Sequence, residues 1–198
     1  MKRIILGSAS PRRRELLQLM GVKFEVLASE AEEHYHSILP PDIVKELALM
    51  KAQNVSELLS KQASWKEDIC VVIGADTIVV KDGQIMGKPK SQEDAFEMIK
   101  SLQGRTHEVY TGVALLECSD KGVYVRANHA EETKVFVHEM EDWEIREYIS
   151  SGEAMDKAGA YGIQGRFATY IDRIEGDYYN VVGLPVAYLY QQLKEVYS

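Results

Sequence analysis

Near its amino terminus the chain reads Ile4-Ile5-Leu6-Gly7-Ser8-Ala9-Ser10-Pro11-Arg12-Arg13-Arg14, an apolar run followed by small residues and three arginines. This order predicts a strand, a tight turn and a helix, because Ser10 is a good N-cap residue and Pro11 suits the first helical position. A helix start attracts anions through its unpaired N–H groups and its partial positive charge. Because guanidinium groups bind phosphate oxygens two at a time, the stretch predicts a phosphate-binding turn. The alternative is that these arginines only face solvent.

The distribution of charge separates this turn from the rest of the chain. The 198 residues carry 23 basic and 31 acidic side chains, and the net charge is −8. The first fourteen residues nevertheless contain five of the basic side chains and no acid. An acidic body is a poor match for nucleic acid, which needs a broad basic surface. One basic spot on such a body suits a small polyanion, so we expect no nucleic-acid partner.

The hydropathy and cysteine patterns favour a cytoplasmic protein. No apolar run approaches membrane-spanning length, and Ile4-Ile5-Leu6 is too short for the core of a secretory signal. Cys70 and Cys118 have no metal-binding or redox spacing, so both are predicted to be buried thiols in a reducing compartment. We therefore expect a cytoplasmic location and no membrane partner.

Strand-like and helix-like segments alternate along the chain. Strands are predicted at 4–6, 24–28, 70–73, 78–80, 107–116, 124–137 and 170–174. Helices are predicted to follow Ser10 and to span 39–59, 91–102, 141–150 and 183–197. Hairpin turns mixed with helices indicate an α/β fold with a mixed sheet. The length allows one domain over 1–198, with room for two small lobes.

Asp76 is the first candidate for catalysis. The stretch Val72-Ile73-Gly74-Ala75-Asp76-Thr77 places this carboxylate after an apolar run, beside two small residues. We expect Asp76 to stand at the end of a strand, where ligands of α/β proteins bind, and to hold Mg²⁺ or activate a water. The alternative is an aspartate that only caps a turn.

Lys88 is a candidate for a phosphate contact. Gly83 and the stretch Gly87-Lys88-Pro89 do not form a Walker A loop, because the glycine spacing is wrong and no Ser or Thr follows the lysine. Pro89 also favours an extended Lys88 rather than a helix start. Such a lysine can meet a phosphate as a point charge. The alternative is an exposed lysine after a hairpin.

Two further segments contain polar groups of interest. The run Ser29-Glu30-Ala31-Glu32-Glu33 is acidic, which indicates either solvent exposure or a divalent cation, and solvent is favoured by the run alone. His34 and His36 follow it and are predicted to be surface groups. The segment 154–165 contains three glycines and Gln164, whose amide donor and carbonyl acceptor complement the edge of uracil or thymine. The alternative is an ordinary surface loop.

Together these segments resemble the Maf family of nucleoside triphosphate pyrophosphatases, which is also known as the septum formation inhibitor family. The matching segments, in the order of the family, are Ser8-Ala9-Ser10-Pro11-Arg12-Arg13, 29–33, Leu47-Ala48 with Lys51-Ala52, Gly74-Ala75-Asp76-Thr77, Gly87-Lys88-Pro89, Thr111-Gly112-Val113, 156–165 and 176–185. They cover nearly the whole chain. An ordered set of this kind is far more specific than any one motif.

The resemblance implies a fold and a reaction. The fold would resemble the inosine-triphosphatase-like α/β fold, a long curved mixed sheet flanked by helices, with the active-site cleft between two lobes of one domain. Proteins of this kind are commonly homodimers. The implied reaction is hydrolysis of a nucleoside triphosphate to the monophosphate and pyrophosphate, as part of clearing the nucleotide pool.

The resemblance also implies residue roles. Asp76 would accept a proton or bind metal, and Glu33 would be the second acid at a divalent Mg²⁺ or Mn²⁺. Arg13, Lys51 and Lys88 would hold the triphosphate. The catalytic set is thus Asp76, Glu33, Lys88 and Lys51, and the metal ligands are Glu33 and Asp76.

Substrate contacts and specificity are implied for Ser8, Arg12, Arg13, Thr77 and Gln164. Arg12 after Pro11, together with Thr77 and Gln164, resembles the subgroup that acts on dTTP and UTP, so pyrimidine triphosphates, including modified ones, are favoured. Two alternatives remain. One is a pyrophosphatase for another base such as 7-methyl-GTP or inosine triphosphate, and the other is a nucleotide-binding regulator of septation.

Overall fold

The structure is a computed structural model that describes residues 2–29, 31–61 and 69–197. The strands are β1 (Lys2–Leu6), β2 (Glu25–Val26), β3 (Ile69–Lys81), β4 (Gln84–Met86), β5 (Thr106–Ser119), β6 (Gly122–Val137) and β7 (Ile171–Glu175). The α-helices are α1 (Pro11–Leu19), α2 (Pro40–Ser60), α3 (Gln92–Leu102), α4 (Asp142–Ser150), α5 (Tyr178–Val182) and α6 (Val186–Tyr197). Short 3₁₀ helices are η2 (Ala158–Ala160) and η3 (Arg166–Tyr170).

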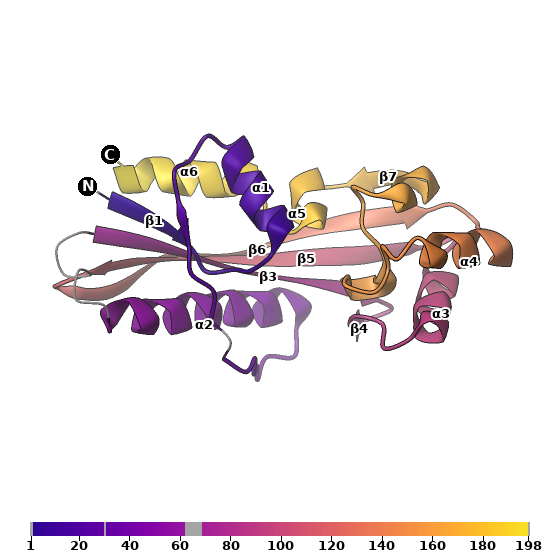
Figure 1. Ribbon diagram of the computed structural model, residues 1–198, viewed down its shortest axis with the longest axis horizontal. Helices are drawn as coiled ribbons and strands as arrows, with labels where there is room; N and C mark the ends of the chain where they lie inside the picture. Colours follow the sequence, from indigo (N-terminus) through magenta and orange to yellow (C-terminus); the bar gives the residue numbers. More distant parts are fainter. Residues whose placement is uncertain (1, 30, 62–68, 198) are drawn as a thin grey trace. The chain divides into compact units, whose positions relative to one another are not determined.

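The strands form one seven-stranded mixed sheet (Figure 1). Its order is β2-β1-β3-β5-β6-β7, and β4 pairs with β3 outside this path. β1 runs parallel to both β2 and β3, with Lys2 opposite Ile69 and Leu6 opposite Ile73. β4 is antiparallel to β3, and β7 is antiparallel to β6. The predicted α/β class, a mixed sheet flanked by helices, is therefore confirmed.

The chain divides into two compact units. The first comprises Met1–Asp76, Thr111–Glu131 and Gly183–Ser198, and the second comprises Thr77–Tyr110 and Glu132–Val182. β3, β5 and β6 each contribute residues to both units. The cleft between two lobes that the sequence implies stays a prediction.

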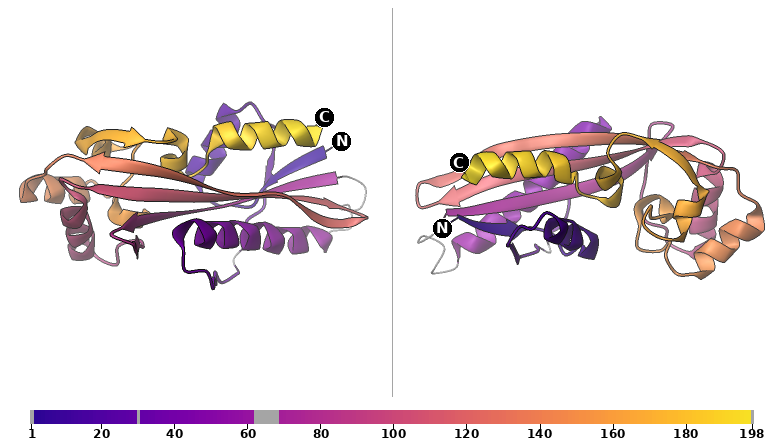
Figure 2. Two further views of the ribbon diagram at one scale, coloured as in Figure 1. Left: turned by 180° about the vertical axis from the view of Figure 1, so that it is seen from behind. Right: turned by 90° about the horizontal axis from the view of Figure 1, so that it is seen from above.

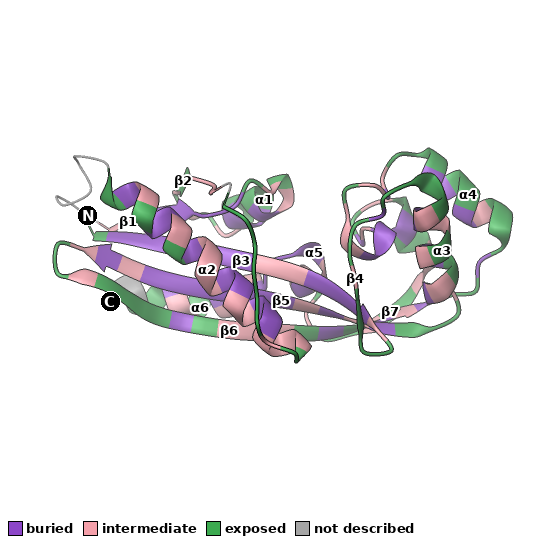
Figure 3. Ribbon diagram, turned by 90° about the horizontal axis from the view of Figure 1, so that it is seen from below, coloured by how far each residue is buried: buried purple, intermediate pink, exposed green. Residues whose placement is uncertain are grey.

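In the first unit, helices cover both faces of the sheet (Figures 1 and 2). α2 lies on one face, and α1 and α6 lie on the other. Buried residues, which are purple in Figure 3, recur along α2 between intermediate and exposed ones. The helix packs its residues Val55 and Leu59 with Ile5, Val72 and Leu116 of the strands. Apolar positions at helical spacing in 39–59 predicted this face, because they form one stripe along the helix.

Two glycines let α2 approach the sheet closely. A Cβ atom on Gly74 of β3 would stand 2.1 Å from the carbonyl oxygen of Ala48 in α2. A Cβ atom on Gly112 of β5 would stand 1.9 Å from the carbonyl oxygen of Val44. No real side chain tolerates such contacts, so the helix sits where it does because both strands lack a Cβ at these points.

In the second unit, α3 and α4 pack on the strands through Ile99, Leu102 and Ile145. Aromatic rings extend this core, with the centroids of Tyr161 and Phe167 4.6 Å apart. His107 of β5 is fully buried in the same unit, and its Nε2 atom lies 2.6 Å from the hydroxyl oxygen of Tyr161. Burial, followed by the nearby charge of Lys81, lowers the pKa of His107 to about 4.

The structure corrects several boundaries. β3 is continuous from Ile69 to Lys81, whereas the strands predicted from the sequence, 70–73 and 78–80, did not include 74–77. These four residues belong to the strand, because Gly74 is needed for helix packing and does not break it. β2 is confined to Glu25–Val26, which is shorter than the predicted 24–28. The short helix α5 was not predicted.

Predicted helix starts agree with the observed caps. Ser10 precedes α1 and its side chain accepts a hydrogen bond from the backbone N–H of Arg13, while Pro11 occupies the first turn. The Ser91 side chain accepts a hydrogen bond from the backbone N–H of Asp94, 3.1 Å away, at the start of α3. Both caps satisfy an N–H group that the helix itself leaves unpaired.

Replacing Gly74 with alanine tests the packing of α2. Because the new Cβ would stand 2.1 Å from a backbone oxygen, α2 or β3 must shift. We expect the free energy of unfolding, measured by urea denaturation, to fall by about 3 kcal/mol. Gly87→Ala is the matched control, because a Cβ there meets nothing within 4 Å. Equal stability of the two variants would contradict this account of the packing.

The buried His107 predicts a dependence of stability on pH. Its pKa is about 4 in the folded protein against an ordinary value of 6.5, so between these pH values the unfolded chain binds the extra proton. The free energy of unfolding should therefore fall as the pH drops from 6.5 to 4, by on the order of 3 kcal/mol from this residue. Denaturation of His107→Gln at several pH values should show a shallower fall than wild type.

A His107→Gln profile that matches wild type across pH 4 to 6.5 would show that burial does not lower the pKa of His107 in the folded protein, and would contradict this prediction.

Candidate functional site

Asp76 lies inside β3 rather than at its end, which corrects the sequence-based expectation of a strand terminus. Its side chain is 13% exposed and lies beside Lys51 of α2. The Nζ atom of Lys51 is 2.5 Å from Oδ1 of Asp76. The contact follows from the fold, because the close packing of α2 at Gly74 brings this turn of the helix next to the strand.

Glu33 completes a cluster of three charged groups. It belongs to the segment between β2 and α2, and its Oε1 atom lies 2.9 Å from the same Lys51 nitrogen. Glu33 is half exposed, whereas Lys51 is 20% exposed. One ammonium group thus bridges both predicted catalytic acids. Of the acidic run 29–33, Glu30 lies outside the described residues.

Arg13 is buried at the start of α1 and contacts the backbone. Its Nε atom donates to the carbonyl oxygen of Gly183 at 2.9 Å, and its Nη1 atom donates to the carbonyl oxygen of Ala75 at 2.8 Å. Nη1 also donates to Oγ of Ser8 at 3.2 Å. The predicted phosphate ligand therefore links α1 to β3 and to Gly183, which lies shortly before α6.

The electrostatics of Arg13 link it to the acidic pair. Burial lowers the pKa of Arg13, while the neighbouring charges of Asp76 and Glu33 raise it. The charge of Arg12 acts with burial to lower the pKa of Arg13, which places Arg12 at the same helix start. Positive and negative groups are thus concentrated around Asp76. Such a site can hold an anion and a divalent cation together.

Ser8 stabilises the turn before α1 through its side-chain hydroxyl. It is buried, and its hydroxyl oxygen accepts hydrogen bonds from the Ser10 backbone N–H at 3.3 Å and from Arg13. Because the hydroxyl fixes both the turn and the guanidinium, the structure gives Ser8 a local positioning contact. Its predicted contact with substrate stays a prediction.

In the second unit, Lys88 and Gln164 are exposed. Lys88 follows β4 outside any helix or strand, and α3 begins only at Gln92, so Lys88 does not start a helix. Within the described part of the chain, neither the Lys88 ammonium nor the Gln164 amide has a hydrogen-bond or ion-pair partner. Both side chains are thus available to a ligand. Thr77 is half-buried on β3.

The first unit therefore brings together Ser8, Arg13, Glu33, Lys51 and Asp76. Arg12 borders this group, while Thr77, Lys88 and Gln164 belong to the second unit. The roles of all nine residues in catalysis and binding stay predictions, because their positions alone do not assign chemistry.

The chemistry of the acidic pair fits a hard divalent cation. Two carboxylates directed at one positive charge are oxygen donors of the kind that Mg²⁺ and Mn²⁺ accept, and Mg²⁺ is commonly held by only one or two carboxylates plus substrate phosphates. Within residues 2–29, 31–61 and 69–197, no group of three or more His, Cys, Asp or Glu side chains could hold a metal ion. A cation at this site would thus depend on substrate oxygens to complete its coordination.

A polar network that sequence reasoning missed holds the segment around α5. The Nδ2 atom of Asn180 donates to the carbonyl oxygen of Val109 at 3.0 Å and to Oγ1 of Thr133 at 2.9 Å. Thr133 in turn donates to the carbonyl oxygen of Asp177 at 3.0 Å. The stretch 176–185 carries no periodic signal, so only its place among the family segments pointed to it. The network explains why an asparagine is buried there.

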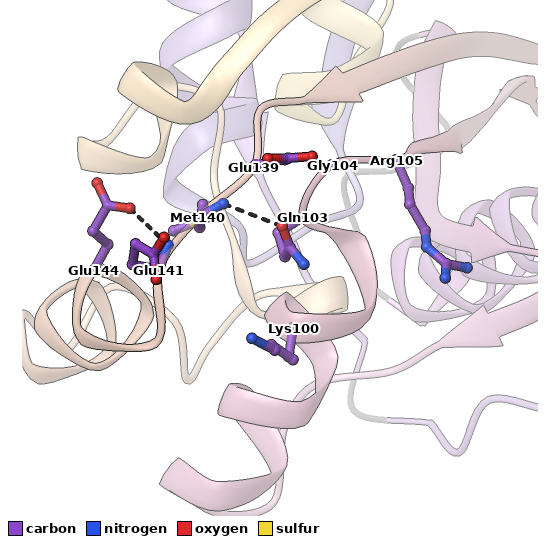
Figure 4. Close-up of a pocket in the computed structure, with 8 residues that line it drawn as sticks. All are labelled: Lys100, Gln103, Gly104, Arg105, Glu139, Met140, Glu141 and Glu144. Atoms are coloured by element: carbon purple, nitrogen blue, oxygen red, sulfur yellow. Dashed lines mark hydrogen bonds between the residues drawn. The ribbon is translucent and has the colours of Figure 1, made fainter.

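A pocket of about 460 Å³ lies between α3 and the start of α4 (Figure 4). Its lining residues are Lys100, Gln103, Gly104, Arg105, Glu139, Met140, Glu141 and Glu144. The Oε1 atom of Gln103 accepts a hydrogen bond from the Met140 backbone N–H, and Glu144 accepts one from the Glu141 backbone N–H. None of the predicted site residues lines this pocket, and the hydrogen bond of Gln103 joins the residue after α3 to the segment before α4.

The described residues contain no helix that is both long enough and apolar enough to cross a membrane. The fold and the cluster around Asp76 together define an α/β protein with a carboxylate pair, a bridging lysine and a buried arginine. Residues 3–196 match the family described as Maf-like protein. The chain belongs to the Maf family.

Curated relatives agree over nearly the full length. A protein of Lachnoclostridium phytofermentans named dTTP/UTP pyrophosphatase is 47% identical over 195 residues, which are 98% of this chain and 95% of the relative. A protein of Alkaliphilus oremlandii with the same name is 49% identical, over 94% of this chain and 92% of the relative. One of Bacillus cereus, also so named, is 48% identical over 98% and 90%.

Proposed function

We propose that this protein is a nucleoside triphosphate pyrophosphatase that hydrolyses dTTP and UTP to the monophosphate and pyrophosphate. The observation that carries the proposal is the contact of Glu33 and Asp76 with one Lys51 ammonium, beside a buried arginine. The names and the full-length coverage of the relatives support the substrate class. Modified pyrimidine triphosphates fit the same proposal.

In this reaction a water oxygen attacks the α-phosphorus. The bond between that phosphorus and the oxygen that bridges to the β-phosphorus breaks, and pyrophosphate leaves with the bridging oxygen. Asp76 either accepts the proton of the attacking water or holds the metal ion, and the Lys51 ammonium keeps its carboxylate in place for either role. Charge develops on the phosphate oxygens, so the site must supply fixed positive groups.

Arg13, Lys51 and Lys88 would hold the triphosphate, and Arg12 would add a further positive charge at the start of α1. Lys51 is the best supported, because it already lies within contact of both acids, and Lys88 is supported by an ammonium that no described carboxylate pairs. Glu33 and Asp76 would hold Mg²⁺ or Mn²⁺. When bound, that ion would neutralise phosphate oxygens and stabilise the departing pyrophosphate.

Thr77 and Gln164 are proposed to recognise the base. The Gln164 amide presents a donor and an acceptor side by side, which matches the alternating edge of uracil or thymine. A purine would need a wider pocket and different partners at its edge. We further propose that the protein is cytoplasmic, which the buried free thiols Cys70 and Cys118 support. We also propose that it forms a homodimer, which the family resemblance supports.

A product assay tests the proposed reaction. The protein is incubated with Mg²⁺ and, separately, dTTP, UTP, CTP, ATP, GTP, ITP or 7-methyl-GTP, and the nucleotide products are separated. We expect monophosphate and pyrophosphate from dTTP and UTP. Diphosphate and phosphate would overturn the reaction, and preferred turnover of 7-methyl-GTP or ITP would overturn the pyrimidine assignment. Nucleotide binding without turnover would instead favour a regulator of septation.

Two variants serve as controls for this assay. Asp76→Asn keeps the size of the side chain and removes its charge, so kcat for dTTP should fall about 10²-fold or more. Glu57→Gln makes the same kind of change at an exposed position of α2 and should keep wild-type kcat. Equal rates in the two variants would remove Asp76 from the mechanism.

A further inference from the structure

The turn over residues 157–161 has an unusual backbone. Gly159 has φ of 67°, and the next residue, Ala160, has φ of 61°. A left-handed conformation costs an alanine about 1 kcal/mol or more, because its Cβ approaches the following carbonyl oxygen. Ala160 is also fully buried. A buried alanine in this conformation persists only where the surroundings fix it, and such fixed turns are common at functional sites.

One side of the turn is tied to the segment that carries Lys88. The backbone N–H of Gly159 donates to the carbonyl oxygen of Gly87 at 3.0 Å, one residue before that lysine. Gly159 also packs on β3, since a Cβ atom there would stand 3.0 Å from Cγ1 of Val79. The position of the turn thus sets the position of the backbone next to Lys88.

The other side leads directly to Gln164. Gly165 donates its backbone N–H to the carbonyl oxygen of Gly162 at 3.3 Å, and the Arg166 N–H donates to Oε2 of Glu153 at 3.0 Å. These bonds close a short loop that exposes Gln164 at its tip. The loop begins at Tyr161, so the place of Gln164 depends on how Tyr161 is held.

Tyr161 is held by His107. The phenol oxygen and Nε2 are 2.6 Å apart, and the two rings meet edge to face with centroids 5.2 Å apart. His107 is fully buried on β5, and Tyr161 is 5% exposed. Among the residues that the structure describes, no group forms a hydrogen bond with Nδ1 of His107. The tyrosine is thus the polar contact that accounts for a histidine at this buried position.

We propose that His107 and Tyr161 are positioning residues that fix the 157–161 turn and thereby set Lys88 and Gln164 in a common arrangement. This inference rests on the proposed function for the roles of Lys88 and Gln164. The hydrogen bond between His107 and Tyr161 affects Lys88 and Gln164 through the backbone. The turn donates a hydrogen bond to Gly87, next to Lys88, and continues into the loop that contains Gln164. Neither positioning residue touches the substrate.

Tyr161→Phe tests the proposal, because it removes the hydroxyl and keeps the ring packing against Phe167. We expect kcat/KM for dTTP to fall about 10- to 100-fold, with KM rising, since small misplacements of binding groups have effects of this size. Preference for dTTP over CTP should fall with it. Hydrogen exchange of peptides that cover 157–165 and the Gly87 segment should accelerate, and exchange of the first unit should not.

Tyr170→Phe is the matched control, because Tyr170 packs against the same Phe167 ring and its hydroxyl has no hydrogen-bond partner among the described residues. It should keep wild-type kinetics and exchange. His107→Leu should behave like Tyr161→Phe, whereas His107→Gln retains a group that can bond to the phenol and should recover part of kcat/KM. That difference separates positioning from packing.

The proposal is overturned if Tyr161→Phe lowers only thermal stability and leaves KM, base preference and exchange at wild-type values. It is also overturned if His107→Gln and His107→Leu lose activity equally. Failure of the proposed function is recognised separately, because wild type would then release no pyrophosphate from dTTP. In that case accelerated exchange at 157–165 in Tyr161→Phe still supports the anchoring of the turn, and unchanged exchange rejects it.

Discussion

The close approach of α2 to the sheet at Gly74 is the constraint on which the candidate site depends. Because β3 has no Cβ at this point, the backbone of the helix at Ala48 can contact the strand. That contact brings Lys51, one turn further along the helix, against Asp76, two residues further along the strand. A larger residue at 74 would push the lysine away from the acid. The lack of a side chain at Gly74 thus allows the ion pair between Lys51 and Asp76 to form.

The charged groups around Asp76 stabilise one another only as a set. Two carboxylates that lie close together repel, and the Lys51 ammonium between them offsets this repulsion. Arg13 stays buried because two backbone carbonyl oxygens and the Ser8 hydroxyl accept from its guanidinium, while the neighbouring acids favour its charge. An incoming triphosphate and a divalent cation would add charges of both signs, so the arrangement suits a substrate that arrives with its counter-ion.

The sequence predicts much of the fold and most of the candidate site residues. The N-cap residues Ser10 and Ser91 could be recognised because each forms a hydrogen bond with a backbone N–H three residues later. The mixed sheet could be predicted because hairpin turns occur among the helices. Lys51 and Glu33 were identified through the resemblance to the family, because no local sequence pattern predicts that they contact Asp76. Their contact brings together α2, β3 and the segment between β2 and α2, which local sequence patterns do not place side by side.

Other features lay beyond sequence reasoning. Residues 74–77 were left outside the predicted strands 70–73 and 78–80. A glycine in a strand signals either a turn or a close approach, and only the position of α2 decides between them. The left-handed conformation of Ala160 could not be predicted from the sequence, because alanine rarely adopts it. The His107–Tyr161 pair joins residues 54 positions apart, and neither residue type has a pattern that identifies its partner.

We infer that this site directs water to the α-phosphorus of a pyrimidine nucleoside triphosphate. Hydrolysis of dTTP in water enriched in oxygen-18, followed by mass spectrometry of both products, shows which phosphorus the water attacks. We expect the label in the nucleoside monophosphate and none in the pyrophosphate. Label in the pyrophosphate would show attack at the β-phosphorus and would rule out this mechanism.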